Sequence, residues 1–290
     1  MKLLNAIAII VLANISLFAQ TYVERLQAAQ PEIEKLLKSM EYKEVITKIE
    51  AMLPPTMPEF TKDDENAGIG MNSFQEFGAI RTFHVYLGQA YVMDGDLEKS
   101  IANFLRAEEI AKLNASEADA VFSPYIQHWN NVHEKAQQAL ENFENIKKRK
   151  AEIEAKGKKQ TKQDKAILAL IIENEPIEEA KIPGWQAEIE SAPANVEQLN
   201  KFCETTKSEA TRFAPAIADL QQDLKSEKET IESKFAGDKV KYVESVIETT
   251  ENLASLKSVA DKVKFLNRLL FLDPSNKAVQ GQLNTILGKS

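Results

Sequence analysis

Few side chains in this sequence have the type and spacing that a catalytic or metal site needs. The three histidines are His84, His128 and His133, and the last two are five positions apart, which does not place them on one face of a helix. Cys203 is the only cysteine. Catalysis needs several groups held together as acid, base or nucleophile. The sequence therefore predicts no catalytic residue, no metal site and no cofactor, so an enzyme is only the third hypothesis.

Two weaker candidates have simpler interpretations. Asp63, Asp64 and Glu65 could collect a cation, but the ligand spacing of a calcium loop is incomplete and a solvated acidic turn is the simpler interpretation. Cys203 falls on an apolar helical stripe, where a cysteine acts as a small core residue. A single cysteine also excludes an internal disulfide, which suits a bacterial periplasm better than a eukaryotic secretory route.

The N-terminus has the pattern of an export signal. Lys2 is followed by an apolar run that ends at the small residue Ala19. At 17 residues, with two asparagines, the run is short for a membrane span. We expect a signal peptide over 1–19 and an exported protein, most simply periplasmic; an uncleaved N-terminal anchor is the alternative.

Charge limits the partners. The chain carries 36 basic and 44 acidic residues, a net charge of −8, which does not favour nucleic acid. Residues 147–165 depart from this balance, with nine basic and three acidic side chains around Gly157. Two interpretations stay open: a solvated tip, or peripheral contact with an anionic lipid surface or an acidic partner.

Residues 81–114 carry the most specific spacing in the chain. They resemble a tetratricopeptide repeat (TPR), a 34-residue helix–turn–helix unit. Seven residues stand at the motif positions or in the turn: Leu87, Gly88, Tyr91, Gly95, Ser100, Phe104 and Ala107. His84 replaces the usual tryptophan, and Lys112 stands where the closing proline is expected. The resemblance implies a helical hairpin in which Gly88 lets the second helix approach closely, and a scaffold for a protein or peptide partner.

Weaker matches to the same unit occur near 26–57 and 243–276. In the first, apolar residues recur at helical spacing on both sides of a break at 39–42. A loop over 54–73, rich in proline and glycine, would separate this hairpin from the one at 81–114. The loop is either a tether or a segment that folds over a groove.

The middle of the chain predicts a long helical arm. Apolar residues alternate at three and four positions over 196–231, and we expect this helix to pack antiparallel on 126–153, with a turn near Gly157. We expect a break near Pro215, an interruption near Pro124, and a buried helical turn for the apolar run 166–172.

These patterns together predict an all-α protein of TPR-like hairpins with an antiparallel, coiled-coil-like arm. The expected parts are the signal peptide 1–19, N-terminal hairpins over 20–124, the arm over 125–237 and C-terminal hairpins over 238–290. The leading functional hypothesis is an exported, non-enzymatic scaffold or adaptor that binds a protein or peptide, with a monomer favoured. A coiled-coil spacer or self-association module of the envelope is the alternative.

Overall fold

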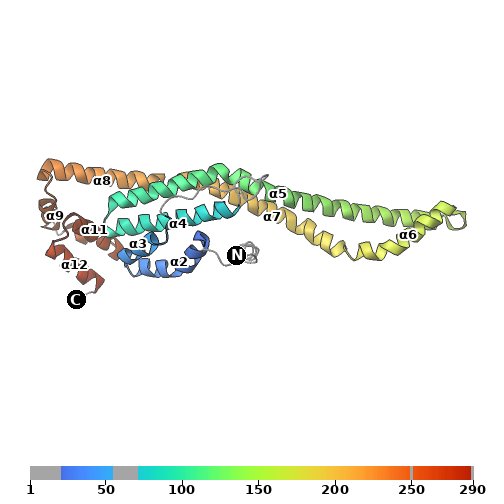
Figure 1. Ribbon diagram of the computed structural model, residues 1–290, viewed down its shortest axis with the longest axis horizontal. Coiled ribbons are helices and arrows are strands. Elements are labelled where there is room, and N and C mark those ends of the chain that lie inside the picture. Colours follow the sequence, from blue (N-terminus) through green and yellow to red (C-terminus); the bar gives the residue numbers. More distant parts are fainter. Residues whose placement is uncertain (1–20, 55–70, 249–250, 289–290) are drawn as a thin grey trace. The chain divides into compact units, whose positions relative to one another are not determined.

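The protein is built from helices. The computed structural model describes residues 21–54, 71–248 and 251–288, and no strand occurs in these ranges (Figure 1). The predicted all-α class is therefore confirmed. The predicted signal peptide, Asp63 to Glu65 and most of the predicted loop 54–73 lie outside the described residues.

The chain divides into two compact units. Unit 1 consists of Met1–Phe60, Asn72–Asn114 and Ala210–Ser290, and unit 2 consists of Thr61–Met71 and Ala115–Glu209. This division differs from the one expected at 124 and 237, because 210–237 belongs with both ends of the chain. The reason is packing: Ile217 and Leu220 share an apolar cluster with Leu97, Ile101 and Phe104.

Unit 1 contains the helices from both ends of the chain and the start of α5. Their bounds are α2 Tyr22–Lys38, α3 Tyr42–Glu50, α4 Met71–Asp94, α5 from Leu97, α8 Ala214–Phe235, α9 Lys239–Glu248, α10 Glu251–Ser255, α11 Val259–Leu272 and α12 Lys277–Leu287. Thr21 and Glu24 form a capping box at the start of α2, and Ser258 and Asn276 cap α11 and α12. Local sequence thus sets where these helices begin.

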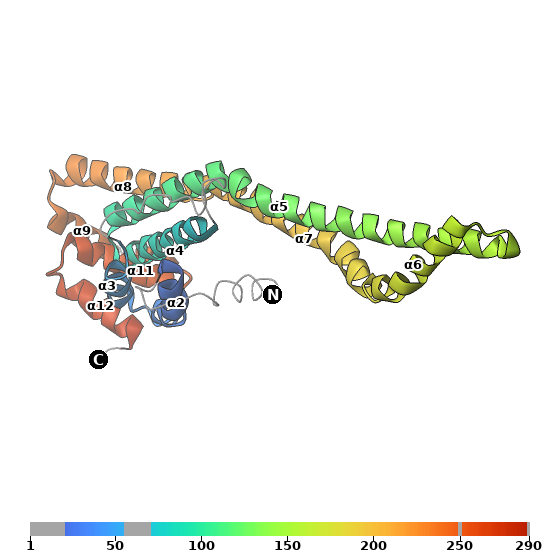
Figure 2. The ribbon, with the colours of Figure 1, turned by 45° about the vertical axis from the view of Figure 1, so that its right-hand side comes forward.

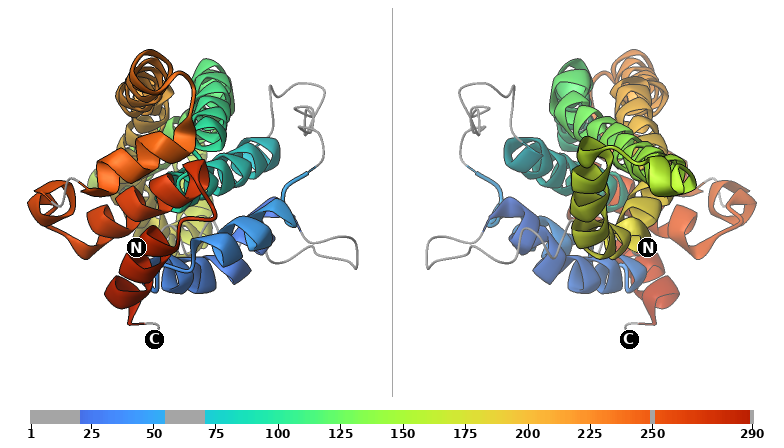
Figure 3. Two further views of the ribbon diagram at one scale, coloured as in Figure 1. Left: turned by 90° about the vertical axis from the view of Figure 1, so that its left-hand side faces the viewer. Right: turned by 90° about the vertical axis from the view of Figure 1, so that its right-hand side faces the viewer.

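The main core of unit 1 forms around α4. Phe83 and Leu87 of α4 lie in one apolar cluster with Ile33 of α2, Ile49 of α3 and Leu266 of α11. Figure 3 shows the blue, teal and red helices of unit 1 gathered together. Helices close to both ends of the chain therefore pack into a single core. Burying this apolar surface is what holds the distant segments together.

Helix α4 begins earlier than the resemblance implies. It starts at Met71, ten positions before Arg81 and inside the predicted loop 54–73. Phe77 and Ile80 explain the extension, because they form a second small cluster with Ile110 of α5. The first helix of the hairpin is consequently longer than the repeat pattern indicates.

Unit 2 is formed by the rest of α5, which ends at Ala155, by α6 Lys162–Glu179 and by α7 Ile182–Ser208 (Figures 1 and 2). A short 3-10 turn, Gly157–Lys159, joins α5 to α6, and Gly157 adopts a φ of 51°. In the described part of unit 2, ion pairs connect Lys156 to Asp164, Lys150 to Glu175 and Asp119 to Lys207. The return segment thus runs antiparallel to α5.

The register of the predicted helix pair is wrong. Residues 196–231 meet earlier positions than 126–153: Cys203 lies at Asp119, Phe213 stacks on Phe104, and Lys228 pairs with Glu98. Residue Lys150, inside 126–153, meets Glu175 instead. The register is shifted because the chain forms α6 and the start of α7 before residue 196. The proline-rich stretch 176–193 gave no indication of these helices.

The prolines explain which helix boundaries were predictable. The expected break near Pro215 is confirmed, because a 3-10 turn at Glu209–Thr211 precedes α8, whose first turn holds Pro215. The expected interruption near Pro124 is wrong, because α5 runs unbroken from Leu97 to Ala155 with Pro124 inside. Pro193 likewise lies inside α7.

None of the helices in the described ranges is both long enough and apolar enough to cross a membrane.

Candidate functional site

The hairpin of α4 and α5 brings the predicted motif residues together. A Cβ atom added to Gly88 would lie 2.8 Å from the Phe104 ring, so the two helices approach closely at this glycine. Ser100 donates a hydrogen bond from its hydroxyl to the Gly88 carbonyl, at 2.8 Å. The packing role predicted for Gly88 thus has a direct geometric basis.

The remaining motif residues also have packing or turn positions. Leu87, Tyr91 and Ala107 are buried, and the Tyr91 hydroxyl donates to the Glu50 carboxylate of α3. Burial, with the Glu50 contact second, raises the pKa of Tyr91. Gly95 forms the turn with a φ of 92°. These residues hold the hairpin and its neighbours together.

One stripe of α4 stays open. Among the residues of this helix, Asn72 and Gln89 are the exposed ones, and Gly78, Thr82 and Tyr86 are half-buried. Gly78, Thr82, Tyr86 and Gln89 follow one another at spacings of four, four and three, so they lie on one face. A Cβ atom added to Gly78 would meet no atom within 4 Å. We call these four residues the Gln89 stripe.

Helix α2 borders the Gln89 stripe with polar groups. Tyr86 has hydrogen-bond contact with Glu34 and Gln30, and burial together with the Glu34 charge raises the pKa of its hydroxyl. Gln30 also donates to Glu34 at 2.9 Å. The stripe thus presents an aromatic ring flanked by amide and carboxylate groups, which suits hydrogen bonding to a polypeptide.

Within α4, Gln89 is exposed, whereas Arg81 is half-buried. A signal for the stripe exists in the sequence, because Gln75, Thr82 and Gln89 recur every seventh residue within an apolar helix.

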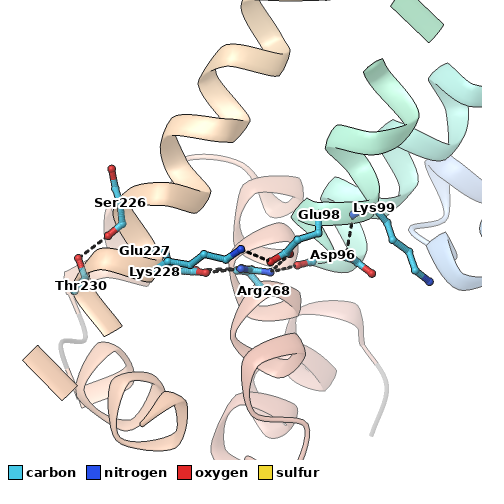
Figure 4. A network of polar contacts seen from close by, with 9 residues as sticks. Asp96, Glu98, Lys99, Ser226, Glu227, Lys228, Thr230 and Arg268 are labelled. Carbon is cyan, nitrogen blue, oxygen red and sulfur yellow. Dashed lines mark hydrogen bonds and ion pairs between the residues drawn. The ribbon is translucent and has the colours of Figure 1, made fainter. Parts of the chain in front are cut away.

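A polar network fixes the α4–α5 turn onto α11 within unit 1. Arg268 donates to the Glu227 carboxylate of α8, at 3.0 and 3.1 Å from its Nε, and to the Gly95 carbonyl at 2.7 Å (Figure 4). The side chains of Arg268 and Glu227 are only 11% and 13% exposed. Glu98 pairs with Lys228 at 3.2 Å nearby. The network is a structural clamp, and it explains why an acid stands on the apolar stripe 196–231.

The histidines and the cysteine are dispersed. His84 lies 2.8 Å from the Asn103 side chain, and burial lowers its pKa. Cys203 is buried in unit 2, 3.4 Å from an Asp119 oxygen, and burial raises the pKa of its thiol. Within the described ranges, no three His, Cys, Asp or Glu side chains lie close enough together to hold a metal ion. The absence of catalytic and metal residues stays a prediction.

Side-chain hydrogen bonds cap the turn of unit 2. Thr161 and Asp164 form a capping box at the start of α6, and Lys156 donates to Asp164 at 2.8 Å. Lys156, followed by the Thr161 backbone, lowers the pKa of Asp164 to about 2, so this carboxylate stays charged near neutral pH. The Gln160 side chain also donates to the Ile153 carbonyl at 2.9 Å.

Helix α6 exposes apolar side chains next to this turn. Leu170, Ile172 and Ile177 are 61%, 53% and 58% exposed. The expectation that the run 166–172 is buried is therefore wrong, because Leu170, Ile172 and the two alanines of the run are exposed and its other residues are only half-buried. The physical reason is that α6 packs on α5 through its opposite side, where Asp164 and Glu175 meet Lys156 and Lys150.

Comparisons with known proteins found no match to this chain. No family model matches it, and neither a curated protein nor a solved structure shows significant similarity. The resemblance to the TPR family consequently stays a prediction that rests on the residues of the α4–α5 hairpin.

Proposed function

We propose that the chain is a non-enzymatic scaffold or adaptor of the cell envelope that binds a protein or peptide partner through its helical hairpins. The observation that carries the proposal is the Gln89 stripe, a face of α4 on which the exposed Gln89 follows the half-buried Gly78, Thr82 and Tyr86. An exposed face that joins Tyr86 to polar groups of α2 suits a polypeptide, since tyrosine gives apolar area and a hydrogen-bonding tip.

The burial of several α4 side chains limits the surface of this helix that a partner can contact. Leu87, Tyr91 and Ala90 are each no more than 4% exposed, so their side chains fill the core. These side chains are therefore not available to a partner, whereas the Gln89 stripe and the neighbouring polar side chains of α2 are at least partly accessible. The resemblance to TPR scaffolds supports the same kind of partner.

Filling the stripe with arginine is expected to reduce partner binding. In the double variant Gly78→Arg and Gln89→Arg, long charged side chains would occupy the stripe on both sides of Tyr86, while the space around Gly78 admits a side chain without a clash. We expect the partner recovered from envelope extracts to fall about tenfold or more, since a central contact typically contributes at least ~1.4 kcal/mol.

The matched control is Ala102→Arg, which adds a charge at an exposed position of α5 away from the stripe. Its recovery should equal that of the unchanged protein, and all variants should melt at the same temperature. Equal recovery with the filled stripe, at unchanged stability, would contradict a role for this face.

The alternative is a spacer or self-association module, and the exposed apolar face of α6 is the observation that favours it. A two-chain contact there would have to offset the entropy lost on association. Leu170, Ile172 and Ile177 are a small patch for that purpose, since stable interfaces bury about 800 Å² on each partner. We therefore propose a monomer.

A further inference from the structure

The end of unit 2 combines unpaired positive charge with exposed aliphatic side chains. Among the described residues, five exposed lysines of this segment have no carboxylate within ion-pair distance: Lys148, Lys158, Lys159, Lys162 and Lys165. The other four basic residues between 147 and 165 pair with acids of unit 2. The free charge is therefore concentrated at the turn and the start of α6.

Two of the five lysines, Lys162 and Lys165, share the outer face of α6 with the aliphatic residues, and Lys158 and Lys159 lie in the turn that precedes this helix. At 100° per residue, Lys162, Ala166, Leu170 and Ile177 fall within one half of the helix, opposite the buried Asp164. Ile172 lies at the border of this half and is also more than half exposed. The face is thus amphipathic along its length, with lysines at its N-terminal end and aliphatic side chains after them.

We propose that this end of unit 2, residues 147–177, binds peripherally to an anionic phospholipid surface. Free lysines attract anionic headgroups, and the aliphatic side chains enter the boundary between headgroups and acyl chains. Long lysine stems can lie along the apolar surface while their ammonium groups reach the phosphates.

Charge complementarity favours a lipid surface over other binding partners of this face. The chain as a whole is acidic, so a cluster with a net charge of +6 within 147–165 needs a dense negative counterpart. A second copy of this face would present the same lysines and repel the first. An acidic protein would match the charge but would not need Leu170 and Ile177 exposed together.

Glu173 is the one carboxylate in the middle of this outer face. Its substitution by lysine should change lipid binding in the opposite direction to the substitutions that remove lysines. Glu173 is exposed, and no ion pair holds it among the described residues. Replacing it with lysine should strengthen binding to an anionic bilayer, because one repulsion becomes an attraction.

The test is co-sedimentation of the purified full chain with vesicles. We expect binding to vesicles of 30% phosphatidylglycerol and 70% phosphatidylcholine at 0.1 M NaCl, and at least tenfold weaker binding to pure phosphatidylcholine or at 0.5 M NaCl. Lys158→Glu with Lys159→Glu should weaken binding at least tenfold. Leu170→Ser with Ile177→Ser should weaken it about tenfold, and Glu173→Lys should strengthen it several-fold.

The matched control is Lys135→Glu with Lys201→Glu, which makes the same charge change at exposed positions of unit 2 outside the cluster, where no described residue forms an ion pair with either lysine. It should bind vesicles as the unchanged protein does, which also corrects for any binding by residues 1–19. Equal binding by the cluster variant and this control would overturn the proposal.

Two further outcomes would also overturn it. One is binding to soluble polyaspartate that equals vesicle binding and does not change in Leu170→Ser with Ile177→Ser, which would indicate an acidic protein as the partner. The other is a dimer in light scattering that Leu170→Ser abolishes, which would indicate a second copy of the chain. The proposed role of the Gln89 stripe is independent of all these results.

Discussion

Arg268→Ala should lower the free energy of unfolding of unit 1 by about 3–5 kcal/mol, as expected for breaking a buried ion pair. The substitution leaves the Glu227 carboxylate with little water and without its partner, and the Gly95 carbonyl loses a donor. Both tryptophans, Trp129 and Trp185, lie in unit 2, so far-UV circular dichroism in urea follows both units and tryptophan fluorescence follows unit 2. The loss of stability should therefore appear in the circular dichroism signal.

Two further variants distinguish the contribution of the Arg268–Glu227 ion pair to stability from that of the neighbouring contacts. Lys228→Ala removes the exposed partner of Glu98, whose side chain is 45% exposed, and should cost less than about 1 kcal/mol. Arg268→Met combined with Glu227→Leu should recover most of the loss, since an apolar pair leaves no buried charge. If Arg268→Ala costs no more than Lys228→Ala, the clamp does not hold unit 1 together.

Gly95→Ala should destabilise unit 1 by about 2–4 kcal/mol, from backbone strain and overpacking together. A Cβ atom at this position would lie 2.5 Å from the Asn267 carbonyl oxygen, and the φ of 92° is unfavourable for alanine. The obstacle is backbone of α11, which cannot rotate away as a side chain can. Urea unfolding followed by circular dichroism measures the effect.

Gly157→Ala is the matched control for the strain alone. Gly157 also has a positive φ, of 51°, but a Cβ atom there would meet nothing within 4 Å. This variant should cost unit 2 only about 1 kcal/mol, visible in tryptophan fluorescence. Equal losses in the two variants would mean that α11 does not approach the α4–α5 turn closely.

The sequence was sufficient where local pattern decides structure. The all-α class, the close approach at Gly88, the turn at Gly95 and the break near Pro215 all follow from nearby residues. The motif spacing placed Ser100 and Phe104 against Gly88 because side chains on facing helices have a fixed period. Long-range pairing was beyond this kind of reasoning.

Three features depend on partners distant in sequence. Glu227 on an apolar stripe gave no indication that Arg268 would neutralise it, because the two positions are far apart in the chain. The apolar run 166–172 suggested burial, yet Leu170 faces away from α5. Helices α6 and α7 form with Pro176 and Pro193 inside them, and this shifted the register of the whole pairing.

The Gln89 stripe could be located only in the structure. Which residues of a largely packed helix are exposed depends on which other helices cover its faces. Helices α3, α5 and α11 contact the buried faces of α4 through Glu50, Phe104 and Asn267. The side beside Gln30 and Glu34 of α2 is left partly open. The proposed binding face is thus defined by the fold of both ends of the chain.

Photo-crosslinking in the native envelope tests the central claim, that this face holds a polypeptide partner, most directly. The probe is a photoreactive amino acid at Gln89, compared with the same amino acid at Ala102 in the same quantity of folded protein. We expect a defined polypeptide adduct from position 89, identified by mass spectrometry, and none from position 102. No adduct at 89, or the same adducts from both positions, would contradict it.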